Sequence, residues 1–243
     1  MSTSAAAARR PSTLAALYGV LLRSQVSIPR LLGIGALGAL AVLLGSFSIW
    51  ADDPVEAASH VVAVYGLGIL VPLAALWLGT AAIGDLVEDR LLVYLWLKPV
   101  PRWQLPAAAV LATVTLVIPL AALPTAVGAL GGNSELALRT FLAASLAALA
   151  YSGLFVAAGL WFRRAVWWGL AFLLLWENVG ANASDGTARF TVTSWARSIV
   201  SAQDGVDIPL DGRSVTASLI VLPAIAIAAW ILATLRYQRA DID

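Results

Sequence analysis

The chain has 243 residues, of which 60% are hydrophobic and 12% are charged, and its formal net charge at pH 7 is +1. So small a charge excludes the basic footprint of a nucleic-acid-binding protein. The chain has no cysteine, which excludes disulfides and thiol catalysis, and its single lysine, Lys98, follows Leu97, so it holds no Gly-Lys-Ser/Thr phosphate loop.

The apolar residues form runs of about 20, the length that a helix needs to cross the hydrocarbon core of a bilayer. We therefore expect an all-α integral membrane protein with one membrane domain and no sizeable soluble domain. The six predicted transmembrane helices cover residues 31–50, 59–83, 104–130, 136–162, 165–182 and 214–235.

Residues 1–30 are predicted to form a cytoplasmic N-terminus with one amphipathic helix. Apolar residues recur at helical spacing between Leu14 and Leu22, which is typical of a helix that lies in the plane of the lipid headgroups. The alternative is a secretory or twin-arginine signal, because Arg9 and Arg10 precede an apolar run, although Arg23 interrupts that run.

Two predicted spans carry residues that affect local geometry. Four glycines lie between Gly33 and Gly45, and small residues let another helix approach closely in lipid. The third span has three prolines between Pro106 and Pro124, which predict kinks.

Arginine and lysine predict the orientation, because basic loops stay in the cytoplasm. With both termini inside, eleven of the fifteen basic residues are cytoplasmic, and four are outside: Arg139, Arg189, Arg197 and Arg213. Residues 84–103 then form a cytoplasmic loop, residues 183–213 an outer segment and residues 236–243 a cytoplasmic tail.

The cytoplasmic loop is the most informative stretch. Residues 85–98 contain neither Gly nor Pro, so a helix can run through them until Pro99 and Pro101 end it. This charged helix and double-proline corner suit the docking of a soluble partner. The candidate docking residues are Asp85, Glu88, Asp89, Arg90, Lys98, Pro99 and Arg102. The alternative is that these charges are only solvated topology signals beside the ends of the spans.

No catalytic residue or metal ligand is expected in this chain. Metalloproteases need paired histidines and serine or cysteine hydrolases need a base, whereas His60 is the only histidine and is predicted to be a solvated residue of an outer loop. The chain is therefore not expected to be an enzyme.

Glu177 is the one acid inside a predicted span, about 18 Å from Ala165 along a helix that rises 1.5 Å per residue. An intramembrane carboxylate is costly and usually faces a partner or a wet cavity, so Glu177 is a candidate for a transport path. The alternative is that it marks the outer end of the helix, where water reaches it.

The stretch from Asp85 to Leu105, an acidic cluster followed by Lys-Pro-Val-Pro-Arg-Trp-Gln-Leu, resembles the loop between the second and third spans of ABC-2 type transporter permeases, membrane subunits of type V-like ABC exporters. The predicted architecture is similar as well. It has an interfacial helix, six spans with both ends inside, a short turn after the fourth span and a long outer segment.

This resemblance implies a permease subunit with no cofactor of its own. A separate ATP-binding cassette ATPase would hold ATP and Mg, and a second permease, identical or homologous, would complete a dimer. Residues 88–102 would form the coupling helix that docks on the ATPase, and Arg163 and Arg164 a second contact. Short helices in the outer segment, including one near residues 194–201, would cap the outer exit.

The resemblance further implies a protein of the bacterial or archaeal cell (inner) membrane that exports a hydrophobic or amphipathic compound. Two alternatives stay open. A stand-alone secondary transporter would be expected to show coupling acids in several spans or an internal repeat. The other alternative is a non-transporting membrane scaffold or assembly protein.

Overall fold

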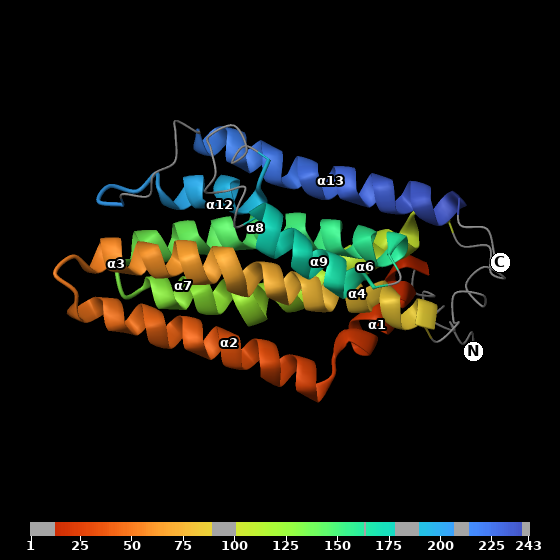
Figure 1. Cartoon of the computed structure of the whole chain (residues 1–243), viewed down its shortest axis with the longest axis horizontal. Coiled ribbons are helices and arrows are strands. Elements are labelled where there is room, and N and C mark those ends of the chain that lie inside the picture. The colour runs from red at the N-terminus through yellow and green to blue at the C-terminus, as the bar shows by residue number, and fades with distance from the viewer. Residues whose placement is uncertain (1–12, 89–100, 163, 178–189, 207–213, 240–243) are drawn as a thin grey trace, which may run out of the picture.

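The computed structural model describes residues 13–88, 101–162, 164–177, 190–206 and 214–239, and of residues 85–88 the backbone alone. Within these ranges every regular element is a helix, which confirms the all-α class. Five helices are long and apolar enough to cross a membrane, and they lie side by side in an elongated bundle (Figure 1). The chain is therefore described here as a multi-pass membrane protein.

The long helices agree with the predicted spans to within about five residues at each end. They run over Ile28–Trp50, Pro54–Gly84, Gln104–Ala129, Ser134–Trp161 and Val215–Arg239. In Figure 1 they correspond to α2 (Ile28–Phe47) with η1 (Ser48–Trp50); α3 (Pro54–Val61), η2 (Val62–Leu70) and α4 (Val71–Glu88); α6 (Gln104–Val117), η3 (Ile118–Ala122) and α7 (Leu123–Ala129); α8 (Ser134–Trp161); and α13 (Val215–Arg239).

The remaining described helices are shorter. They are α1 (Thr13–Gln25), α9 (Ala165–Ala171) with its continuation η4 (Phe172–Glu177), and α12 (Val192–Val200). The predicted fifth span, residues 165–182, is described only as the apolar helix Ala165–Glu177, which is shorter than the other five, and residues 178–182 lie outside the described ranges.

We call the end at which α4 ends and α6 begins the loop end. Helices α8 and α13 also end there, whereas α12 lies at the opposite end, which we call the α12 end (Figure 1).

Helix α8 forms the centre of the bundle and packs against α4, α13, α12 and α7. Alanine is the most frequent residue on its buried face, and these small side chains let the neighbours approach closely. In the apolar windows of α2 and α13 only 28% and 22% of the residues are buried, against 56% for α8. These two helices are therefore peripheral, and their exposed apolar faces suit contact with lipid.

Glycines of α2, which in the sequence suggested only an interface, allow it to cross α7 at close range. A Cβ added at Gly45 would clash with the backbone of Gly128, and one at Gly38 would lie 2.9 Å from the carbonyl oxygen of Leu120. A Cβ at Gly35 would meet nothing within 4 Å. The glycine face of the first span is thus used for packing within the chain.

Three of the described apolar helices change from α-helical to π-helical geometry along their length, at η2, η3 and η4. η3 contains Pro119, and Pro124 lies in the first turn of α7, so the prolines coincide with a change of helical geometry rather than a break. Pro106 lies in the first turn of α6, where its missing amide proton has no intrahelical partner to lose. π-Helical turns are frequent at functional sites.

Candidate functional site

The predicted docking loop is described only at its edges. Helix α4 continues as far as Glu88, so the second span and the first residues of the predicted loop helix are one helix. The side chains of Asp85 and Glu88, and the residues Asp89, Arg90, Lys98, Pro99 and Arg163, lie outside what the structure describes. The candidates whose side chains can be placed are Arg102, Arg164 and Glu177.

Arg102 joins the end of the loop to the last span. One of its terminal guanidinium nitrogens donates a hydrogen bond of 2.8 Å to the carbonyl oxygen of Gln238. Beside it, the indole of Trp230 donates to the carbonyl oxygen of Trp103 at 3.4 Å, and the two indole rings pack edge to face with centroids 6.4 Å apart. The segment that leads into α6 is therefore attached to α13.

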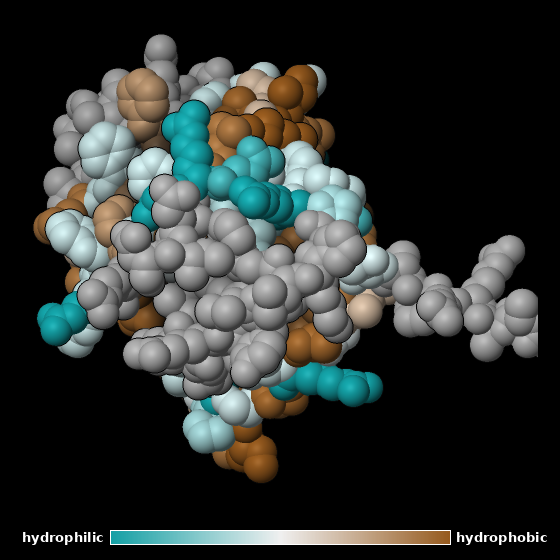
Figure 2. Space-filling view, turned by 90° about the vertical axis from the view of Figure 1, so that its right-hand side faces the viewer, coloured by the Kyte–Doolittle hydropathy of each residue, from teal (hydrophilic) through white to brown (hydrophobic). Residues whose placement is uncertain are grey.

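Helix α1 packs against the loop end of α6 and α4 instead of only covering the membrane surface. Leu21 is fully buried in a cluster with Ile83 and Ala109. The Tyr18 hydroxyl donates to the hydroxyl of Thr115 at 3.1 Å. Figure 2 shows the loop end from outside, where strongly hydrophilic side chains lie beside apolar ones around its margin.

At the α12 end, Glu177 caps a helix. Its side chain is 3% exposed, and its two carboxylate oxygens accept hydrogen bonds of 3.0 Å from the backbone amides of Val192 and Thr193. These amides open α12 and have no partner within the helix. Glu177 thus satisfies both donors and places a negative charge at the positive end of the helix dipole.

Two further polar contacts hold α12 inside the bundle. The hydroxyl groups of Tyr151 on α8 and Thr193 on α12 are 2.8 Å apart. The guanidinium of Arg197 donates two hydrogen bonds, of 3.1 and 3.0 Å, to the carbonyl oxygen of Ala63 in η2. Burial lowers the pKa of Arg197, and the nearby Tyr151 and Glu177 oppose this shift. An arginine stays protonated in proteins, so α12 carries the positive charge of Arg197 while the Glu177 side chain of η4 caps its first turn.

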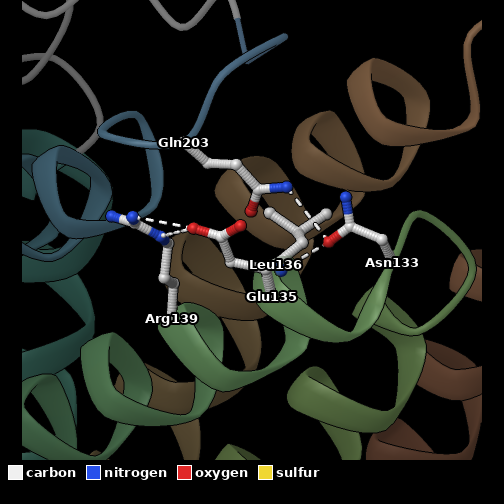
Figure 3. A network of polar contacts seen from close by, with 5 residues as sticks. All are labelled: Asn133, Glu135, Leu136, Arg139 and Gln203. Carbon is white, nitrogen blue, oxygen red and sulfur yellow. Dashed lines mark hydrogen bonds and ion pairs between the residues drawn. The ribbon is translucent and has the colours of Figure 1, made fainter.

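A second polar network ties the residues that follow α12 to the start of α8 (Figure 3). The amide nitrogen of the Gln203 side chain donates to Oδ1 of Asn133 at 3.0 Å, and the same oxygen accepts from the backbone amide of Leu136 at 2.7 Å. One turn into α8, Arg139 pairs with Glu135 at 2.8 Å. The helix α12 is therefore fixed at both of its ends.

We did not predict the partners of Glu177 from the sequence. Tyr151, Thr193 and Gln203 were not predicted as site residues, and Arg197 was predicted only as an outer charge. The sequence of α12 could have indicated these contacts, because a short helix with both polar and apolar residues between two spans can pack into a bundle. The predicted helix near residues 194–201 is confirmed as Val192–Val200.

Hydrogen bonds with Glu177, Tyr151 and Ala63 join α12 to three other helices, and we call this set of contacts the latch. Its role is structural. Within the described ranges, no group of three or more His, Asp or Glu side chains could hold a metal ion. His60 is exposed on α3. Comparison of the sequence with protein-family models and with curated proteins finds no match.

Proposed function

We propose that the chain is the permease subunit of an ATP-binding cassette transporter of the ABC-2 type. In this proposal the loop end is cytoplasmic, the helix that begins at Ala165 completes a sixth span, and a separate ATPase docks on residues 85–102 and on Arg163 and Arg164. The observation that best supports the proposal is that α4 and α6 continue towards the loop end beyond the level at which α1 crosses them.

Helix α1 crosses α6 near Thr113, whose hydroxyl lies 3.4 Å from the side-chain oxygen of the buried Gln25. Thr113 is nine residues after Gln104, the first residue of α6, so the crossing is about 14 Å from the end of that helix at 1.5 Å per residue. If α1 lies at headgroup depth, as its apolar spacing predicts, the ends of α4 and α6 extend beyond the lipid into water. A soluble ATPase can reach them there.

The contacts of the loop end would transmit a displacement of the loop. A partner that moves residues 85–102 would act on α4 and α6 directly, and on α13 through Arg102 and Trp103. We propose that ATP-driven closure of two ATPases shifts these helices in two paired permeases and opens a path outward. The ATPase would bind ATP and Mg, and this chain would have no enzymatic activity and no cofactor.

The transported compound is proposed to be hydrophobic or amphipathic, and the direction to be export from a bacterial or archaeal cell. The spans are predominantly apolar, with a mean hydropathy between 1.9 and 2.4, which suits such a cargo. Helix α12, held between the spans by polar contacts, is proposed to close the outer exit.

A stand-alone secondary transporter is the second candidate, but the setting of Glu177 does not favour it. A coupling carboxylate must bind and release an ion or a proton, whereas both oxygens of Glu177 already accept hydrogen bonds from α12. A non-transporting scaffold is the third candidate, and the co-purification and ATP turnover of a partner distinguish it from a permease.

The test is a pull-down of the tagged protein from its native host in mild detergent, with mass spectrometry of the bound proteins. One variant replaces residues 88–102 by a neutral linker, and a matched control neutralises charges at the α12 end with Asp52→Asn, Glu135→Gln and Arg139→Gln. We expect an ATPase with Walker motifs to bind the wild type and the control but not the linker variant. If no ATPase binds while other membrane complexes stay intact, the proposal is wrong.

A further inference from the structure

A cavity of about 300 Å³ opens at the loop end, where α2, α4, α8 and α9 meet. Its described lining includes Arg30 at the start of α2, Arg164 before α9, Thr80 and Gly84 on α4, and Trp77 and Trp167. These residues come from three parts of the sequence.

Small residues provide the space in this cavity. Ala81, Gly84, Gly159 and Ala165 contribute to its lining. A Cβ added at Gly84 would meet nothing within 4 Å, so the space beside it is open. Large aromatic rings of Trp77, Phe162 and Trp167 form the rest of the wall. The cavity thus combines open space with flat apolar surfaces.

The charge of the lining is of one sign. Among the described residues that line the cavity, the charged ones are Arg30 and Arg164, and both are cationic. Each lies where an apolar helix begins, which is the depth of the lipid headgroups. Tryptophan is enriched at the same depth.

A second cavity, of about 270 Å³ and mostly apolar, lies next to the first. Phe162 lines both, and the second is otherwise formed by α8, α9 and η4. It extends from the headgroup depth into the apolar part of the bundle, because its lining includes Leu154 and Phe172.

We propose that the two cavities bind one anionic phospholipid of the leaflet at the loop end. Its phosphate lies between Arg30 and Arg164, and an acyl chain occupies the apolar cavity. A guanidinium recognises phosphate by charge-assisted and bidentate hydrogen bonds, and basic pockets between transmembrane helices on the cytoplasmic side bind anionic headgroups. This inference does not require the ATPase partner.

The test uses nanodiscs of phosphatidylcholine with a minor fraction of phosphatidylglycerol, and native mass spectrometry counts the lipids that stay bound. The variants are Arg30→Gln with Arg164→Gln, and Gly84→Leu, which fills the cavity. The matched control is Arg23→Gln, an exposed arginine of α1 at the same end.

We expect one phosphatidylglycerol bound per wild-type chain, at an affinity that falls about fivefold for each arginine replaced, since one basic residue contributes about 1 kcal/mol. Gly84→Leu should lower it as well, and Arg23→Gln should not. Circular dichroism verifies folding, and Arg164→Gln alone replaces the double variant if that one does not fold. Unchanged binding in the variants, an equal loss in Arg23→Gln, or displacement of the lipid by inorganic phosphate would overturn the proposal.

Discussion

Replacing Glu177 tests whether the latch at the α12 end holds that helix in place. Glu177→Ala removes both acceptors of the amides of Val192 and Thr193, which are buried and have no other acceptor within α12. Two average interhelical bonds in a membrane give a lower limit of about 1.2 kcal/mol, and two bonds to a charged acceptor give about 3–6 kcal/mol. Because both amides are buried, we expect a cost of about 3 kcal/mol.

Hydrogen exchange measures this cost locally, because the amides of residues 192 and 193 report the opening of α12. A cost of about 3 kcal/mol corresponds to a loss of protection of roughly 100-fold. Glu177→Gln keeps one acceptor and should lose about half of that free energy. The matched control is Glu135→Gln, which breaks an exposed ion pair with Arg139 and should cost less than about 1 kcal/mol. Protection at residues 192 and 193 equal to the wild type in Glu177→Ala would refute the capping role.

Other substitutions test the packing and the remaining contacts of α12. Gly45→Ala should destabilise the protein by about 1–3 kcal/mol through overpacking, measured by thermal denaturation in detergent, while Gly35→Ala on the same helix should have almost no effect; equal effects would contradict the close crossing. Arg197→Lys should lose the paired hydrogen bonds to η2 although it keeps the charge, and wild-type hydrogen exchange in residues 192–200 of that variant would argue against the contact. A double-mutant cycle of Tyr151→Phe and Thr193→Val should show a coupling of about 1 kcal/mol in the free energy of unfolding, and strict additivity would exclude the hydroxyl pair.

The transmembrane helices could be predicted from the sequence because the requirement of the bilayer is local. A run of about 20 apolar residues satisfies that requirement whatever its neighbours are. The glycines of α2 suggested an interface for a related reason, since small residues let another helix approach closely in lipid. They did not show which helix crosses there.

The latch could not be predicted in the same way, because its contacts are not local. Tyr151 and Thr193 are 42 residues apart, and Arg197 and Ala63 are 134 residues apart. A single sequence shows that Glu177 is placed in a span but does not show which amides it meets. Arg197 illustrates the limit best, since the charge count that predicts orientation treats it as an outer charge and says nothing of its hydrogen bonds to η2.

The fifth span marks another limit. Hydropathy predicts an apolar helix over residues 165–182 and shows Glu177 only as an acid inside it, whereas the carboxylate of Glu177 accepts a hydrogen bond from the first turn of α12. Hydropathy alone does not reveal such a partner.

The proposed function requires a soluble ATPase that binds this chain through the segment between α4 and α6. The most direct measurement places a photo-crosslinking amino acid at position 98, in place of Lys98, and irradiates intact membranes of the native host. The matched control carries the same amino acid in place of Glu135, an exposed residue of the α12 end. The account predicts that position 98 captures a protein with Walker motifs and that position 135 does not. Capture of such a protein from position 135 alone, or from neither position while other membrane complexes crosslink normally, would contradict it.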